Sequence, residues 1–268
     1  MPKPADRLTI PGLQAMKARG EKIVVLTAYD ASFAAAMDEA GIDLILVGDS
    51  LGMAVQGHGT TLPVTLDHMI YHTACVGRGL NRAVLLADLP FMSYATVGEA
   101  LHNSARLMRE AGAQMVKLEG GRKRREVIRA LAEQDIPVCG HLGLLPQSVH
   151  RLGGYRVQGK DSRAAEIILE DAILLQEAGA GLLVLECVPA GLAAEITAVL
   201  SIPTIGIGAG PHCDGQVLVC YDMLGITPGK RPKFSKNFLE NGGDIRSAIR
   251  SYAAEVRAGR FPGTEHSF

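Results

Sequence analysis

The chain has 268 residues, with 27 basic and 28 acidic side chains and a formal net charge of -1. Such a balance produces no strong field that would draw the protein to nucleic acid or to a membrane surface, so we expect neither partner. The length fits one large α/β barrel or two small domains, and it provides a sizeable core without disulfides or a structural metal.

The chain has five cysteines, an odd number, and none of them belongs to a Cys-x-x-Cys motif. Neither a disulfide framework nor a zinc knuckle is therefore predicted. No signal peptide is recognisable, and no apolar run approaches the roughly 20 residues of a membrane span. We expect a cytoplasmic protein, since a reducing compartment suits unpaired thiols.

Apolar runs, capping residues and turn signals predict helices and strands in alternation. In the first half of the chain these are a helix over residues 8–19, a strand over 23–28, a helix over 30–40, a strand over 43–47, a helix over 63–77, a strand over 83–87, a helix over 96–111 and a strand over 114–118. In the second half they are a helix over 123–133, a strand over 136–139, a helix over 162–178, a strand over 181–185, a helix over 189–200, a strand over 203–207, a strand over 217–221 and a helix over 243–258.

Eight strands with alternating helices favour a single (β/α)8 barrel over an open sheet. We expect residues 1–268 to form one such domain, with an N-terminal helix and a C-terminal helical extension. Two glycine-rich stretches, 48–61 and 143–161, follow strands and are predicted to be long loops on the face where barrels build their active sites.

A short pattern occurs three times: Glu-Ala-Gly, then an apolar run, then an acid. The three tripeptides are Glu39-Ala40-Gly41, Glu110-Ala111-Gly112 and Glu177-Ala178-Gly179. A glycine after a helical stretch suits a left-handed C-terminal cap, and the apolar run suits a strand buried on both faces. Each unit therefore predicts a carboxylate at the end of a strand, and these carboxylates are Asp49, Glu119 and Glu186.

Asp49, Asp88 and Glu119 end three consecutive predicted strands. Neighbouring strands lie roughly 4.8 Å apart, so the three acids would crowd together and raise one another's pKa. A hard divalent cation relieves this repulsion, and Mg²⁺ is the natural candidate because it prefers oxygen ligands. Taken one at a time, each acid also fits a local role in a turn or in solvent.

Three other side chains belong to the same predicted face. Lys117 shares a side of its strand with Glu119 and suits a substrate carboxylate or an enolate oxygen, or else a structural ion pair. His141 follows the fifth strand and fits a turn donor, a substrate ligand or an acid–base group. Glu186, beside an apolar wall, fits a general base of raised pKa, or else a salt bridge or a cap.

Two further motifs give weaker signals. The glycine-rich run Gly206-Ile207-Gly208-Ala209-Gly210 lies where barrels often bind phosphate, but it also fits a tight turn. The basic run Arg122-Lys123-Arg124-Arg125 fits a solvated helix face, with an anion site as the alternative.

Taken together, the chain resembles the ketopantoate hydroxymethyltransferase family over nearly its full length. The motifs that carry the resemblance are Thr27-Ala28-Tyr29-Asp30, Val47-Gly48-Asp49-Ser50-Leu51-Gly52-Met53, Ala87-Asp88-Leu89-Pro90-Phe91-Met92, Val116-Lys117-Leu118-Glu119-Gly120-Gly121, Gly140-His141-Leu142-Gly143-Leu144, Leu185-Glu186-Cys187-Val188-Pro189, Ile205-Gly206-Ile207-Gly208-Ala209-Gly210 and Asp222-Met223-Leu224-Gly225. Each motif alone is modest, whereas their common order is specific.

The resemblance implies a Mg²⁺-dependent barrel that assembles as a homodecamer. It implies transfer of a one-carbon unit from 5,10-methylenetetrahydrofolate to 3-methyl-2-oxobutanoate, which gives 2-dehydropantoate for pantothenate and coenzyme A synthesis. It assigns the metal to Asp49 and Asp88, with Glu119 completing the shell. It assigns the 2-oxo acid to Ser50 and Lys117, with Asp49, Asp88 and His141 also facing the substrate, and the base role to Glu186.

Two other classes of function fit parts of the pattern. The acid cluster alone also suits another Mg²⁺-dependent enolate-forming barrel, of the phosphonopyruvate mutase or isocitrate lyase type. A non-catalytic barrel that binds a small anion is the second alternative. A complete set of acids, lysine and a candidate base argues against it, because binding alone needs no base.

Overall fold

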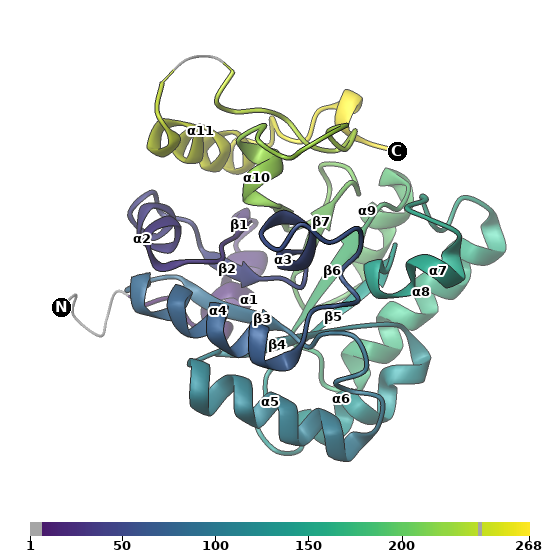
Figure 1. The fold of residues 1–268 in the computed structure, drawn as a ribbon. Helices are drawn as coiled ribbons and strands as arrows, with labels where there is room; N and C mark the ends of the chain where they lie inside the picture. The colour runs from purple at the N-terminus through teal and green to yellow at the C-terminus, as the bar shows by residue number, and fades with distance from the viewer. Residues whose placement is uncertain (1–6, 241–242) are drawn as a thin grey trace.

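Eight parallel strands close into a barrel in chain order, with helices around it, in the computed structural model (Figure 1), which describes residues 7–240 and 243–268. The strands are β1 (Ile23–Thr27), β2 (Leu44–Val47), β3 (Val84–Asp88), β4 (Met115–Glu119), β5 (Val138–Gly143), β6 (Leu182–Glu186), β7 (Thr204–Ile207) and β8 (Gly215–Leu218). The predicted (β/α)8 fold is confirmed.

Helices connect the strands and cover the outside of the barrel. They are α1 (Ile10–Ala18), α2 (Ala31–Glu39), α3 (Leu51–Ala54), α4 (Leu66–Gly79), α5 (Val97–Ala111), α6 (Arg125–Ala132), α7 (Val149–Leu152), α8 (Ser162–Glu177), α9 (Ala190–Val199), α10 (Cys220–Met223) and α11 (Ile245–Arg257). Short 3₁₀ turns are η2 (Arg122–Arg124), η3 (Pro146–Ser148) and η4 (Thr264–His266). No helix in the described ranges is both long enough and apolar enough to cross a membrane.

The strands are buried on both faces, and alternate residues belong to two different cores. Val25, Leu86 and Met115 lie in the inner cluster that fills the barrel, whereas Leu26 and Leu85 pack outward against the helices. This alternation follows from the two-residue period of a strand. The same alternation determines which polar side chains at the strand ends point into the barrel.

The helix ends follow local capping chemistry. Thr9 Oγ1 accepts a hydrogen bond from the N–H of Gly12 at the start of α1, where a threonine is a favoured cap. Gly41, Gly112 and Gly179 have φ values of 81°, 77° and 106°. The repeated Glu-Ala-Gly units therefore end their helices in the left-handed conformation, as predicted.

The seam between the first and last strands is held by the C-terminal helix. The Tyr252 hydroxyl in α11 lies 2.9 Å from the Val25 carbonyl oxygen of β1 and 3.0 Å from the Gln216 carbonyl oxygen of β8. Tyr252 is fully buried. The helical extension thus contacts both strands whose pairing closes the barrel.

The prediction for the eighth strand is wrong in its second half. Strand β8 ends at Leu218, and residues 220–223 form α10 instead of continuing the strand. The Cys220 N–H donates to Thr27 Oγ1, which turns the chain at this point. A run of apolar residues suits a buried helical turn as well as a strand, so periodicity alone does not distinguish them.

The fifth strand is longer than predicted. It continues to Gly143, so His141 lies within it, not in the turn that follows. Gly140 and Gly143 suggest a break, but both pair with β6, opposite Leu183 and Glu186. Gly143 has φ 93°, and a Cβ there would lie 2.1 Å from the Glu186 carbonyl oxygen. These glycines therefore permit close approach of neighbouring strands.

The two predicted loops are partly helical. Residues 48–61 contain α3, and residues 143–161 contain η3 and α7. The helix predicted from residue 63 begins at Leu66, because Thr65 and His68 form a capping box. The helix predicted from residue 123 is preceded by η2.

Candidate active site

Four acids lie at the C-terminal end of the barrel. Asp88, Glu119 and Glu186 are the last residues of β3, β4 and β6, and Asp49 lies two residues beyond β2. Asp88 follows the inward-facing Leu86, and Glu119 follows the inward series of Met115 and Lys117. The barrel therefore brings together the acids that the strand ends predict.

Asp49, Asp88 and Lys117 form a buried charged group. The register places Asp88 opposite Lys117, and the Lys117 Nζ lies 2.7 Å from Asp88 Oδ1. This is an ion pair without the alignment of a hydrogen bond. The other oxygen of Asp88 accepts a hydrogen bond of 3.1 Å from the Asp49 N–H. Lys117 is only 5% exposed, so its charge has little contact with solvent.

The pKa values reflect an excess of negative charge. Burial, and then the charge of Asp88, raises the pKa of Asp49 to about 7. Burial, and then Asp49, raises the pKa of Glu119 well above its ordinary value. Burial alone would lower the pKa of Lys117, but Asp88, Glu119 and Asp49 together raise it.

This donor set fits a divalent cation. Four buried or half-buried acids share one lysine, and the Asp88 Oδ1 atom has no well-aligned hydrogen-bond donor. Carboxylate oxygens are the ligands that Mg²⁺ prefers, usually one or two with water and substrate. Across residues 7–240 and 243–268, no three acidic, imidazole or thiol side chains form a ready metal cluster. The assignment of Glu119 to the metal shell stays a prediction.

His141 lies between two acids of the site. Its Nδ1 atom is 3.6 Å from Glu119 Oε1, and its Nε2 atom is 3.2 Å from Glu186 Oε2. Neither contact has the alignment of a full hydrogen bond. Burial, and then the nearby Lys117 charge, lowers the pKa of His141 well below its ordinary value, so the ring is neutral.

Glu186 occupies an apolar and tightly held position. Burial raises its pKa to about 7, and Lys117 opposes that shift. The next residue, Cys187, has φ 47°, a left-handed conformation uncommon for a residue with a side chain. The Cys187 carbonyl accepts a hydrogen bond from the Gln158 N–H. This constrained turn helps to fix the Glu186 carboxyl at the end of β6.

Ser50 lies where α3 begins, and its Oγ is 2.8 Å from the Tyr29 hydroxyl. The sequence prediction includes Ser50 but omits Tyr29 as a partner. It also omits Tyr94 and Gln147, which contact the acids directly. The only signal for Gln147 is its position in the predicted functional stretch 143–161, and an isolated polar residue there has no distinguishing pattern.

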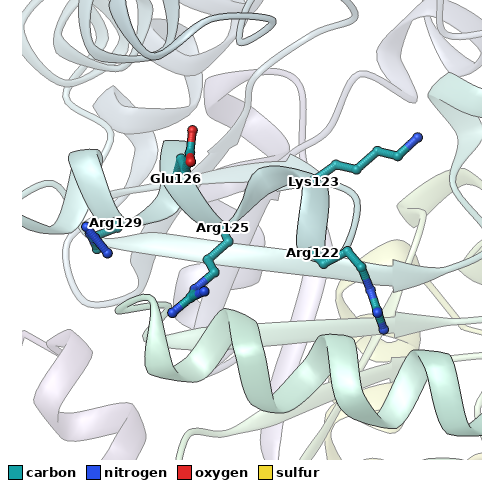
Figure 2. Close-up of a pocket in the computed structure, with 5 residues that line it drawn as sticks. All are labelled: Arg122, Lys123, Arg125, Glu126 and Arg129. Atoms are coloured by element: carbon teal, nitrogen blue, oxygen red, sulfur yellow. The ribbon is translucent and has the colours of Figure 1, made fainter.

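Two hollows lie near this end of β4. One, of about 390 Å³, is lined by Arg122, Lys123, Arg125, Glu126 and Arg129 (Figure 2). Arg122 and Arg125 extend to the same side in Figure 2, and Glu126 to the opposite side. Arg122 also pairs with Glu170 and Asp171 of α8. The basic run is thus partly neutralised at the surface by acids of α8.

The second hollow, of about 70 Å³, reaches the candidate site itself. Its lining residues come from the segment after β3, the turns after β4 and β5, and the end of β4: Phe91, Met92, Tyr94, Ala95, Glu119, Arg124, Gln147 and Ser148. The Arg124 guanidinium lies 4.9 Å from the centre of the Tyr94 ring. This hollow places Glu119 and Gln147 at the edge of the charged group.

Solved structures with the same fold include phosphonopyruvate hydrolase, crystallised with oxalate and Mg²⁺. Its TM-score with this chain is 0.61 at 11% sequence identity, and the match covers 93% of this chain and 99% of that one. At this identity the likeness concerns the fold alone.

Sequence comparison gives a much more specific result. The chain is 62% identical over 263 residues to the 3-methyl-2-oxobutanoate hydroxymethyltransferase of Methylococcus capsulatus, covering 98% of this chain and 97% of that protein. It is 60% identical to the enzyme of the same name from Nitrosococcus oceani, covering 98% and 99%. The family model for ketopantoate hydroxymethyltransferase matches residues 7–264. The chain therefore belongs to the ketopantoate hydroxymethyltransferase family.

Proposed function

We propose that this hydroxymethyltransferase moves a one-carbon unit from 5,10-methylenetetrahydrofolate to 3-methyl-2-oxobutanoate and forms 2-dehydropantoate, with Mg²⁺ as cofactor. The single observation that carries the proposal is the arrangement of Asp49, Asp88 and Lys117 beside Glu186, which has a raised pKa, at one end of the barrel. In this arrangement the aspartates offer ligands for a cation, the lysine offers a positive charge for a substrate anion, and the glutamate offers a base.

Asp49 and Asp88 would hold the cation, and Glu119 would complete its surroundings. The excess of carboxylates over positive groups supports this assignment, as do the raised pKa values of Asp49 and Glu119. When bound, Mg²⁺ would supply Lewis-acid polarisation of the 2-oxo group. The phosphonopyruvate hydrolase of the same fold was crystallised with oxalate and Mg²⁺, and this supports the proposal of a cation in a barrel of this kind.

Lys117 and Ser50 would bind the oxygens of the 2-oxo acid. An ammonium group has three N–H donors, which can serve substrate oxygens while the charge stays paired with Asp88. The Ser50 hydroxyl is held by Tyr29. Asp49, Asp88 and His141 complete the walls that face the substrate.

Glu186 would remove the proton from C3 of the substrate. A pKa of about 7 suits a general base that works near neutral pH. Neutral His141, with Nε2 at 3.2 Å from Glu186 Oε2, lies beside the carboxyl group without neutralising it. The substrate carbon C3 would then form the new C–C bond to the methylene carbon of the folate while one C–N bond breaks, and water would supply the hydroxyl oxygen while the second C–N bond breaks. The C3 proton and one water proton end on the two folate nitrogens, so tetrahydrofolate leaves.

Isotope exchange tests this proposal separately from folate chemistry. We expect 3-methyl-2-oxobutanoate to lose its C3 proton to deuterated water in the presence of Mg²⁺. NMR spectra recorded without folate measure this exchange. Adding 5,10-methylenetetrahydrofolate should then give 2-dehydropantoate. Absence of exchange with Mg²⁺ present would contradict the proposed base chemistry.

The alternatives are less well supported. The enolate-forming barrels of the phosphonopyruvate type share the fold with this chain at low identity, whereas the hydroxymethyltransferases match it at about 60%. A non-catalytic anion-binding barrel does not suit a site with four acids and one lysine. Assays with phosphonopyruvate would test the first alternative, because cleavage of its C–P bond would favour that class.

The proposal extends to location and assembly. We propose that the chain acts in the cytoplasm as a homodecamer of single-domain protomers, on small-molecule substrates alone. This part of the proposal is supported by family resemblance, not by any contact in the structure. Light scattering of the purified protein would give ten times the chain mass if the assembly is correct.

A further inference from the structure

Gln147 contacts two of the site's acids with two different groups. Its side-chain Nε2 donates a hydrogen bond of 2.8 Å to Asp49 Oδ2, and its backbone N–H donates one of 3.1 Å to Glu119 Oε2. Gln147 is 9% exposed and lies in η3, on the connection after β5. It joins acids carried by β4 and by the segment after β2, so its contacts span the site.

A directed chain of hydrogen bonds fixes the orientation of the Gln147 amide. The Glu119 N–H donates to the Tyr94 hydroxyl at 3.3 Å, and that hydroxyl donates to Gln147 Oε1 at 2.5 Å. The Nε2 atom also donates to the Leu89 carbonyl oxygen at 3.0 Å. Rotating the amide by 180° would place Oε1 against the acceptors Asp49 Oδ2 and the Leu89 carbonyl oxygen. Only the observed orientation therefore gives each of these oxygens a donor.

The barrel strands do not by themselves fix the carboxyl oxygens. A strand places the Cα and Cβ atoms, but the terminal torsions of Asp and Glu are broad and have no sharply preferred angle. Gln147 engages one oxygen of each acid, Asp49 Oδ2 and Glu119 Oε2. This leaves Asp49 Oδ1 as the oxygen available to a cation, while Glu119 Oε1 faces His141.

We infer that Gln147, oriented by Tyr94, is a positioning residue that sets the carboxylate planes of Asp49 and Glu119 for cation binding. The inference rests on the proposed Mg²⁺ site and adds to it two residues that touch neither cation nor substrate. Outer hydrogen-bond partners of metal ligands commonly affect metal affinity by about 10–100-fold. Gln147 is such a partner for two acids at once.

Calorimetric titration of the folate-free protein with MgCl₂ tests this inference. We expect Gln147→Met to weaken Mg²⁺ binding about tenfold or more, since methionine keeps the length of the side chain but removes the donor to Asp49. The backbone N–H that holds Glu119 stays in this variant, so the loss reports on Asp49. Tyr94→Phe should weaken it by a smaller factor. The double variant should lose less binding free energy than the sum of the two single losses, because Tyr94 acts on Asp49 through Gln147 and contacts only the Glu119 N–H by itself.

Gln158→Met is the matched control on the same connection. Among the described residues, the only hydrogen bond of the Gln158 side chain goes to the Arg156 carbonyl oxygen, so this substitution should leave the Mg²⁺ affinity unchanged. Thermal unfolding of the metal-free variants gives the second readout. A merely structural role would lower the melting temperature of Gln147→Met and leave its Mg²⁺ affinity equal to that of the parent.

The outcomes separate this inference from the proposed function. A parent protein with no measurable Mg²⁺ binding would contradict the metal site itself. A parent that binds Mg²⁺, with equal affinity in Gln147→Met, would overturn the inference alone. If Gln147→Met does not fold, Tyr94→Phe decides: weakened Mg²⁺ binding supports the inference, and unchanged binding overturns it.

Discussion

The Nε2 atom of His141 lies 3.2 Å from the Oε2 atom of Glu186, and both side chains are largely removed from solvent. The ring is neutral, because burial and the Lys117 charge lower its pKa well below the ordinary value. Glu186 therefore has a polar neighbour that adds no positive charge beside its carboxyl group. Its pKa remains near 7, in the range where a carboxylate is an effective base.

Replacing the base should separate binding from turnover. Glu186→Gln keeps the shape of the side chain but cannot accept a proton, so we expect turnover to fall by about 10²–10⁴-fold. The KM for 3-methyl-2-oxobutanoate and the affinity for Mg²⁺ should change little. Steady-state kinetics and C3-proton exchange measure these effects. The exposed Glu177→Gln on α8 is the matched control, and normal turnover in Glu186→Gln would remove Glu186 from the base role.

The rate should depend on pH through Glu186. The base must be ionised, so the turnover rate should rise with pH through the pKa of about 7. A bound cation adds positive charge and should move this midpoint downward. Ser50→Ala, which leaves every charge in place, should keep the same midpoint even where its KM rises. A flat profile of the turnover number between pH 5 and 8 would disagree with Glu186 as the titrating group.

Mg²⁺ should stabilise the protein more at high pH than at low pH. The folded-state pKa values of Asp49 and Glu186 are raised to about 7, so the metal-free folded state binds more protons than the unfolded state. Its stability is therefore lost as the pH rises from the unfolded pKa values near 4 toward 7. Melting curves with EDTA or Mg²⁺ at pH 5 and pH 8 should show the larger Mg²⁺ effect at pH 8. Equal effects at both pH values would contradict a cation bound by these acids.

Removing the buried lysine should destabilise the metal-free protein. Lys117→Met leaves Asp88 without its ion pair, and breaking a buried pair from one side costs about 3–5 kcal/mol. We expect this loss in urea unfolding at pH 8, with EDTA present. Lys123→Met, at the surface hollow, should change the free energy of unfolding by less than about 0.5 kcal/mol. Comparable losses in both variants would mean that Lys117 is not held by the acids.

The parts of the fold that sequence predicts well are those with a strong local pattern. Glycines 41, 112 and 179 end helices, and the apolar runs after them become strands buried on both faces. The acid at each strand end then follows from barrel geometry. The error at residues 217–221 arose because an apolar run fits both a strand and the buried turn of α10.

The contacts that sequence does not predict join distant segments. Gln147 lies 98 residues from Asp49 in the chain, and no periodic pattern marks their hydrogen bond. The sequence predicts His141 after its strand, whereas β5 continues to Gly143, where the missing side chain lets β5 approach the Glu186 carbonyl oxygen of β6. Such contacts depend on which strands become neighbours. Local patterns in a single sequence do not contain that information.

The seam of the barrel has a consequence for its synthesis. Strand β1 is among the first segments to leave the ribosome, but its partner β8 comes nearly 190 residues later, and Tyr252 of α11 later still. Until then β1 has one unpaired edge, exposed to other chains. The pairing of β1 with β8 thus closes the nascent barrel late, and a chain stopped before Tyr252 lacks the hydroxyl that contacts both strands.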